Sequence, residues 1–274
     1  MKKDDRVTIF LSPGELFWIA TYLGYPSLPF LGGFLKNFTN EQLKDLLSGG
    51  LETLEMRNMV QEQGKVQQID GLIQSLIGII AVPEYALIIS SIRKSEPPSQ
   101  YFIYFKDNQS LMVAQKDRFF NLGLFREVSS LERSLISGLG IGPQTSEKAS
   151  SITLPGLDLI GMLSKVWKDP VASIEIFQKA GLTSEKSQVL IDTLAVITNA
   201  SVINRIDWEK GTPIKTSELH LINHSTSLWL METTGPVTAS IQLNPQNTIF
   251  TGNTIRRFIQ PTFQVYTENQ EEIT

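Results

Sequence analysis

Two histidines are the first residues to consider for catalysis or metal binding, because a histidine side chain exchanges protons near neutral pH. His220 lies within a predicted strand, and His224 lies in the predicted turn 223–226 that follows it. Residues four apart in a strand share a face but are roughly 13 Å apart, too far to bind one metal ion. The sequence has no cysteine, which excludes thiolate nucleophiles, cysteine metal ligands and disulfides. We therefore expect no metal and no cofactor, and a structural or surface role for both histidines.

No sequence motif for catalysis is recognisable. Segment 138–143 (GLGIGP) lacks the GxGxxG spacing of a phosphate-binding loop, and Pro143 has no backbone N–H to offer a phosphate. Walker, HExxH, GxSxG, EF-hand and paired-carboxylate signatures do not occur. We therefore predict that the protein is not an enzyme. A site assembled from distant carboxylates would leave no such signature, so it stays an alternative.

Charge argues against nucleic acid as a partner. The chain has 24 Lys and Arg against 28 Asp and Glu, a formal net charge of −4, with both signs interspersed. This distribution lacks the basic face that would neutralise a phosphate backbone. The helices expected in 39–60 resemble a helix-turn-helix, but they carry more acidic residues than basic ones. A DNA-binding regulator with a winged-helix-like N-terminal part is thus an alternative that the charges oppose.

Composition predicts a globular, cytoplasmic protein. Hydrophobic residues make up 41% of the chain and charged residues 19%, so burial can offset the loss of chain entropy. The polar start of the chain, and the break at Ser12-Pro13 after a short apolar stretch, predict that there is no signal peptide. The most apolar run, 72–82, is shorter than the ~20 residues of a membrane-spanning helix. We therefore expect no membrane partner.

The first half of the chain is predicted to contain a strand, several helices and an antiparallel meander. Strand 7–10 leads into Ser12, Pro13 and Glu15, which form a capping box with proline at the first helical position. Thr39 and Gln42 form a second capping box, whose helix we expect to end at Gly49-Gly50. Further helices are predicted at 51–60, 67–80 and 130–139, and strands at 86–92, 100–106, 111–115 and 119–126.

The same order of elements returns after segment 141–151, the predicted linker. Helices are predicted at 157–167, 170–180, 184–196 and near 254–259. Strands are predicted at 200–206, 218–222, 227–232 and 237–243, with one more over 262–266. We expect a first α+β repeat over 1–140 and a second over 152–274, which together form one compact body.

Residue matches support an internal duplication. Segment 72–76 (LIQSL) matches 190–194 (LIDTL), each just before its meander, and 102–105 (FIYF) corresponds to 219–222 (LHLI). This alignment places His220 at the position of Ile103. Two unrelated meanders with a generic apolar pattern are the alternative. The predicted fold class is α+β: two tandem repeats of helices plus a four-stranded antiparallel meander, joined about a pseudo-twofold axis into a shared sheet flanked by helical bundles.

Two loops hold the residues that we predict for partner binding, and each joins the first two strands of a meander. We expect both to be longer than a two-residue hairpin. Both combine charge with proline, which limits the entropy lost on ordering. A plain solvated connection is the alternative to a partner-binding rim on one side of the sheet. The residues are Arg93, Lys94, Glu96, Pro97, Pro98, Glu209, Lys210, Ile214 and Lys215.

The chain resembles the EspG family, the cytosolic chaperones of mycobacterial type VII secretion. The resemblance rests on the opening strand followed by 11–16 (LSPGEL), on the stretch 23–29, and on the repeated helix-plus-meander. It implies tandem units around a central antiparallel sheet, and a monomeric or weakly dimeric adaptor that holds the apolar tip of a helical partner until export. It also implies that loop 93–98 and the surface of 159–196 bind this client.

Our leading hypothesis is therefore a noncatalytic protein-binding adaptor or secretion chaperone. An enzyme with a distributed carboxylate site would instead require a deep pocket holding at least two carboxylates with raised pKa values. A DNA-binding regulator would require a basic stripe on the folded surface.

Overall fold

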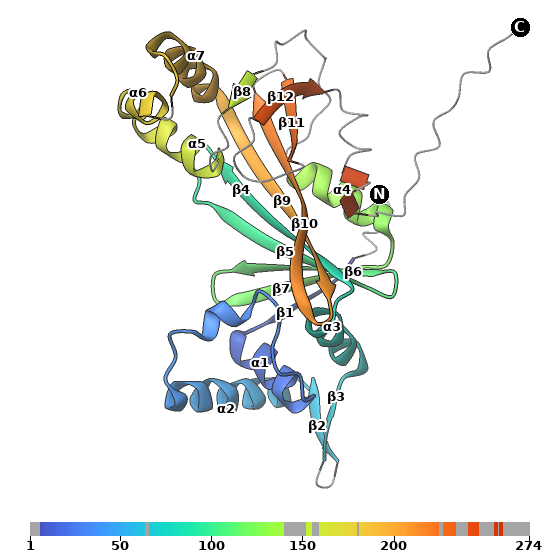
Figure 1. Ribbon diagram of the computed structural model, residues 1–274. Coiled ribbons are helices and arrows are strands. Elements are labelled where there is room, and N and C mark those ends of the chain that lie inside the picture. Colours follow the sequence, from blue (N-terminus) through green and yellow to red (C-terminus); the bar gives the residue numbers. More distant parts are fainter. Residues whose placement is uncertain are drawn as a thin grey trace, which may run out of the picture. The chain divides into compact units, whose positions relative to one another are not determined.

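The computed structural model describes residues 6–63, 66–139, 152–154, 159–179, 181–224, 227–233, 241–246, 255–256 and 258–259. They form an α+β fold with one large antiparallel sheet and one small two-stranded sheet (Figure 1). The chain falls into two compact units, each described by itself below. Unit 1 comprises Met1–Ile89, Gln100–Leu131 and Ile206–Thr216, and unit 2 comprises Ser90–Ser99, Glu132–Arg205 and Ser217–Thr274.

The large sheet has the strand order β1-β7-β6-β5-β4-β9-β10-β11-β12-β8. The first half of the chain supplies β1 (Arg6–Leu11), β4 (Tyr85–Arg93), β5 (Ser99–Lys106), β6 (Gln109–Lys116) and β7 (Phe119–Phe125). The second half supplies β8 (Ile152–Leu154), β9 (Ile197–Glu209), β10 (Thr212–His224), β11 (Ser227–Thr233) and β12 (Ile241–Gln246). In each half the strand that opens the half pairs with the last strand of the meander. All eight predicted meander strands are therefore present, although residues 237–240 of the last one lie outside the described residues.

Two hairpins, one in each half, end at positions that can be compared. Lys106 pairs with Gln109 in the first half, and His224 pairs with Ser227 in the second. The number of positions that separates these matching pairs in the two halves equals the number that separates helical segments 72–76 and 190–194. At this offset Phe102, and not Ile103 as in the predicted alignment, falls at the position of His220. We propose that 1–140 and 152–274 descend from one duplicated unit, and the common strand order supports this.

In unit 1 the first helix begins where the capping box was predicted. Helix α1 (Pro13–Tyr22) has Ser12 as its N-cap, whose hydroxyl accepts the backbone N–H of Glu15 at 3.2 Å. Its last residue, Tyr22, stacks on Trp18 with ring centroids 5.1 Å apart. The Tyr22 hydroxyl donates to the carbonyl of Gln67 at 2.8 Å and accepts the N–H of the same residue at 3.1 Å. The end of α1 is thereby tied to one residue of strand β3 (Val66–Ile69).

The prediction that Gly49-Gly50 ends a helix was wrong. Helix α2 starts at the predicted capping box of Thr39 and runs without a break over Asn40–Met56. A Cβ added to Gly50 would lie 2.3 Å from the carbonyl carbon of Gly14 in α1. Gly50 is therefore required because two helix backbones touch there, and not because the chain turns.

The segment after α2 is also different from the prediction. Residue 60, predicted to end one helix, and residues 67–69, predicted to start another, lie in a two-stranded sheet formed by β2 (Val60–Gln63) and β3 (Val66–Ile69). Helix α3 (Gly71–Ala81) begins later than predicted, because the Asp70 side chain caps the N–H groups of Leu72 and Ile73 at 2.9 and 3.2 Å. A 3-10 helix, η1 (Gly32–Leu35), lies between α1 and α2 in sequence.

The core of unit 1 is formed by apolar side chains of α1, α2, α3 and the sheet. In β5 three consecutive residues, Ile103, Tyr104 and Phe105, are buried, so both faces of the sheet are covered at that point. The turn from β5 to β6 has positive φ at Asp107 and Asn108, as a two-residue type I′ hairpin requires. Core members include Leu16, Ile19, Leu54, Ile77, Leu111 and Leu122.

Unit 2 contains the other helices of the described chain. Helix α4 (Val128–Gly138) starts in unit 1 and ends in unit 2, and α5 (Leu159–Lys168), α6 (Pro170–Lys179) and α7 (Ser184–Ala195) confirm the three helices predicted after the linker. The core of unit 2 includes Leu163, Phe177, Leu190 and Leu194. Residues 255–256 and 258–259 are helical, within the predicted terminal helix. The predicted linker 141–151 and strand 262–266 lie outside the described residues.

Candidate partner-binding site

Loop 94–98, between β4 and β5, holds most of the first set of predicted binding residues and belongs to unit 2. All its residues are exposed. Ser95 has a φ of 70°, and the N–H of Glu96 donates to the carbonyl of Arg93 at 3.1 Å. The Arg93 guanidinium also lies 3.7 Å from the Glu96 carboxylate. The loop therefore leaves β4 through a turn closed by its own contacts and continues into Pro97 and Pro98.

The two cations at the start of this loop contact the ends of two helices. Arg93 Nη2 donates to the carbonyl of Gly138, the last residue of α4, at 3.0 Å. Lys94 Nζ donates to the carbonyl of Ala195, the last residue of α7, at 3.2 Å. Carbonyls at helix C-termini have no partner within the helix and carry partial negative charge, so cations are favourable there. Arg93 and Lys94 therefore position the loop against α4 and α7.

Helix α7 presents one apolar stripe to the core of unit 2 and a different stripe to solvent. Leu190, Ile191 and Leu194 are buried. Val189 and Val196, seven residues apart, are 61% and 47% exposed and lie on one side of the helix. Exposed carboxylates flank them at Glu185 and Asp192. We call loop 94–98 and this exposed stripe the loop–α7 surface.

The second predicted loop is shorter than expected. Strand β9 continues to Glu209 and β10 starts at Thr212, so the connection is the two residues Lys210 and Gly211. Both have positive φ, of 50° and 80°, which fits a type I′ hairpin. The prediction of a longer loop was wrong, because proline at 213 is accommodated within β10 near its start. Ile214 is exposed there.

The two predicted loops belong to different units. Glu209, Lys210, Ile214 and Lys215 belong to unit 1, whereas loop 94–98 belongs to unit 2. In unit 1, Trp208 at the end of β9 packs its ring against Phe30, with centroids 5.8 Å apart. The tip of the β9–β10 hairpin is thus anchored to the core of unit 1. A rim shared by both loops stays a prediction.

His220, the residue with the clearest chemical potential in the sequence, lies in the interior of unit 2. It is buried, and its Nε2 contacts the carboxylate of Glu218, two residues earlier in β10. Within the described residues, no group of three or more histidines and carboxylates could hold a metal ion. The arrangement is a polar pair within one strand, in which His220 is buried and Glu218 is partly buried.

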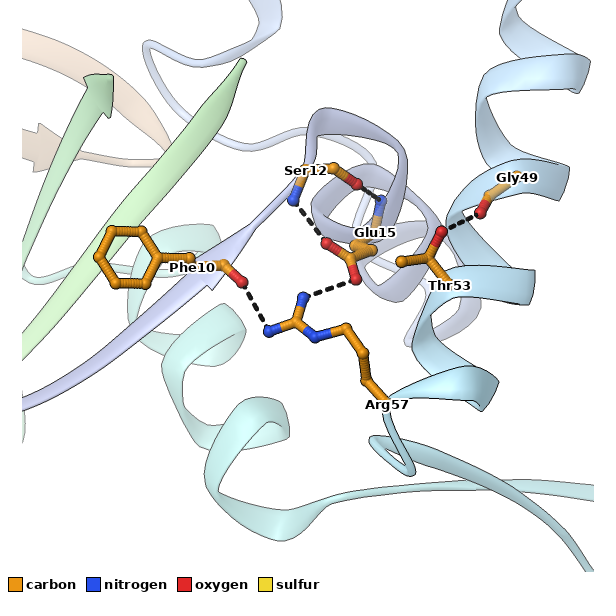
Figure 2. Close-up of polar contacts among 6 residues, drawn as sticks. All are labelled: Phe10, Ser12, Glu15, Gly49, Thr53 and Arg57. Carbon is orange, nitrogen blue, oxygen red and sulfur yellow. Dashed lines mark hydrogen bonds and ion pairs between the residues drawn. The ribbon is translucent and has the colours of Figure 1, made fainter. Parts of the chain in front are cut away.

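Sequence reasoning missed an ion pair in unit 1 that has a buried carboxylate. Figure 2 shows the carboxylate of Glu15, which is fully buried, between two donors. The backbone N–H of Ser12 donates to Glu15 Oε2 at 2.6 Å, and Arg57 Nη1 donates to Glu15 Oε1 at 2.7 Å. The second nitrogen of Arg57, Nη2, donates to the carbonyl of Phe10 at 2.9 Å. The capping box predicted the Ser12 contact. Nothing in the sequence indicates that Glu15 and Arg57, which are 42 positions apart, form a pair.

Two more polar contacts involve a buried residue, Tyr104 in one and Glu132 in the other. The Tyr104 hydroxyl donates to the carbonyl of Pro29 at 2.7 Å, and burial raises the pKa of this tyrosine well above its usual value of 10. In unit 2, Arg256 Nη2 lies 2.7 Å from the carboxylate of Glu132 on α4, and the hydrogen bond to that carboxylate raises the pKa of Arg256. The first contact ties Pro29 to β5, and the second ties Arg256 to α4.

The comparisons with known proteins show a likeness of fold. No family model matches the sequence, and no curated protein matches it. Among solved structures, the chain is similar to EspG5 in the structure of the Mycobacterium tuberculosis type VII secretion system chaperone EspG5 in complex with the PE25-PPE41 dimer. The TM-score is 0.58 at 9% sequence identity, over 91% of this chain and 95% of that chain. At this identity the likeness concerns the fold alone, and it agrees with the fold that the EspG resemblance implied.

Proposed function

We propose that this chain is a noncatalytic adaptor of the secretion-chaperone type, which binds a helical protein client in the cytoplasm and acts as a monomer or weak homodimer. The observation that carries the proposal is the fold likeness to EspG5, a chaperone whose structure was solved with a bound protein dimer, over 91% of this chain. None of the helices in the described residues is long and apolar enough to cross a lipid bilayer.

The loop–α7 surface is where we expect the client to bind. Val189 and Val196 are spaced seven residues apart, as in an apolar seam that receives another helix. Lys94 lies at the end of this stripe, and Glu185 and Asp192 border it. Apolar contacts would supply the affinity, and the charges around them would select the partner.

The experiment is affinity capture of the tagged full-length chain from its own host, under mild conditions, followed by mass spectrometry. We expect a co-purifying protein of helical character. Val189→Asp combined with Val196→Asp should abolish its retention, because each change places a charge in the apolar stripe. Val171→Asp is the matched control, since Val171 on α6 is 75% exposed and lies outside this surface.

Clean purification of the wild-type chain in the presence of candidate clients would contradict the adaptor proposal. If the double variant and the control retain the client equally, only the proposal that the client binds the loop–α7 surface is contradicted. The second set of predicted residues is tested in the same assay with Ile214→Asp, which should weaken retention if the β9–β10 tip also contacts the client.

A further inference from the structure

The outer edge of β1 is a row of backbone groups at one end of the large sheet. β1 is the terminal strand beside β7 and pairs with it through six consecutive residues, from Arg6 opposite Phe125 to Leu11 opposite Phe120. The register has no bulge. Unpaired edge groups of this kind readily accept a strand from another chain.

The turn between β6 and β7 determines which backbone groups of β1 face outward. Lys116 and Phe119 flank a two-residue turn, so they form a hydrogen-bonded pair, and such pairs alternate along the strands. The N–H and C=O groups of residues 120, 122 and 124 therefore point from β7 toward β1. Their partners are Leu11, Ile9 and Val7. It follows that the backbone groups of Arg6, Thr8 and Phe10 point away from the sheet.

The contact of Arg57 agrees with this assignment and limits the open length of the edge. Its Nη2 donates to the carbonyl of Phe10, which must face outward to accept it (Figure 2). Among the described residues, no partner contacts the Phe10 N–H, either backbone group of Thr8, or the Arg6 carbonyl. The available edge thus runs from Arg6 to the N–H of Phe10, with two donors and two acceptors.

The side chains along this edge are apolar at one end and cationic at the other. Phe10 is 48% exposed, and so is Phe119, which lies on the same face of the sheet next to Lys116. At the other end, the Arg6 guanidinium lies 5.8 Å from the centroid of the Phe125 ring. Within the described chain, Arg6 Nε is buried without a hydrogen-bond partner, and no carboxylate pairs with Arg6.

β1 carries few of the devices that protect an edge strand. It contains no proline, no lysine and no bulge, and its one charged residue is Arg6. Arg57 covers a single carbonyl at the end of the row and is itself neutralised by Glu15. The remaining groups offer main-chain hydrogen bonds for affinity and two distinct side-chain positions for specificity.

We propose that β1 is a docking edge for an extended, acidic segment of a partner protein, which adds antiparallel to the sheet. The segment carries an apolar residue opposite Phe10 and, four residues later, an aspartate or glutamate opposite Arg6. Its backbone bonds to Thr8 in the middle. This binding mode is independent of a helical client, because it uses an edge of unit 1 and not the loop–α7 surface.

The test is selection of random linear dodecapeptides displayed on phage against the immobilised full-length chain. We expect the enriched peptides to carry an acidic residue four positions after an apolar residue. The residues between them should have high strand propensity. A fluorescein-labelled synthetic peptide of the consensus sequence then gives dissociation constants by fluorescence polarisation.

Thr8→Pro is the decisive variant, because the Thr8 N–H makes no bond within the sheet, and proline is tolerated at such edge positions. It should weaken binding of the labelled peptide at least about tenfold, whereas Thr8→Val, which keeps the N–H, should leave it unchanged. Arg6→Glu should also weaken it about tenfold and select basic residues in place of the acid. Unaltered melting temperatures show that the variants fold.

Three results would overturn the proposal. One is that no peptide is enriched above the level seen with Thr8→Pro. Another is that enriched peptides show helical spacing or bind Thr8→Pro equally well. The third is that light scattering shows a dimer for the wild-type chain and a monomer for the Thr8→Pro variant. The edge would then be occupied by a second copy of the chain.

Discussion

The helix pairs α1–α2 and α6–α7 show two ways of holding helices together. In unit 1, α1 and α2 meet at Gly14 and Gly50, and the buried carboxylate of Glu15 in α1 bonds to Arg57, the residue that ends α2. In unit 2, α6 and α7 contribute Phe177 and Leu194 to an apolar core. Backbone contact and a buried charge tolerate almost no change of residue, whereas packed apolar side chains can adjust. We therefore expect substitutions of similar size to cost unequal free energies in the two units.

Gly50→Ala should show the largest effect. The added methyl group would meet the backbone of α1 at 2.3 Å, so the helices must move apart. We expect the free energy of unfolding, measured by urea denaturation, to fall by about 3 kcal/mol. Gly49→Ala is the control, because open space surrounds Gly49, and there alanine should stabilise the helix by roughly 0.5–1 kcal/mol. Equal effects at the two positions would refute the close backbone contact.

Arg57→Leu should be the next most harmful change. It leaves the Glu15 carboxylate buried with only the Ser12 N–H as donor. Because Arg57 is itself partly exposed, we expect a loss of about 2 kcal/mol rather than the larger cost of a wholly buried pair. Adding Glu15→Gln to this variant should recover part of the loss in the same assay. A double-mutant cycle without coupling would show that the pair contributes nothing.

In unit 2, Leu194→Met should have a smaller effect, although Leu194 is fully buried. Methionine has a similar volume and adapts to irregular space, so we expect a loss of about 1 kcal/mol. Urea denaturation measures this loss too. A cost as large as that of Gly50→Ala would remove the contrast between the two helix pairs.

Lys94→Ala should produce the smallest change. It removes the cation at the C-terminus of α7, where an exposed charge contributes about 0.5 kcal/mol. Hydrogen exchange of the last turn of α7 should rise while the rest of unit 2 is unaffected. Lys179→Ala, which breaks only an exposed pair with Glu175 within α6, is the comparison variant.

The elements with local signals could be predicted from the sequence, and the exceptions have physical causes. The capping boxes at Ser12 and Thr39 locate two helix starts, because their contacts span three residues. Gly50 was misread because a glycine that relieves contact with a distant backbone looks the same in sequence as one that ends a helix. The β2–β3 sheet was missed because its glutamine-rich strands lack the apolar alternation that marks most strands.

The partner-binding residues were only partly foreseeable. Charge and proline identified loop 94–98, but the two helix ends that Arg93 and Lys94 contact are 45 and 101 residues away in the chain. Val189 and Val196 were not singled out, since an exposed valine on a helix differs from a core valine only through its neighbours in space. Edge position in a sheet is likewise a property of the whole topology, so β1 carried no sequence sign of its outward-facing groups.

The tie between Tyr22 and Gln67 gives the protein an optical probe of its own. The tyrosine hydroxyl holds both backbone groups of one β3 residue while its ring rests on Trp18. Separation of the β2–β3 ribbon from α1 would release that ring and change the surroundings of the indole. Near-ultraviolet circular dichroism and tryptophan emission can therefore follow opening of the ribbon in the unlabelled chain.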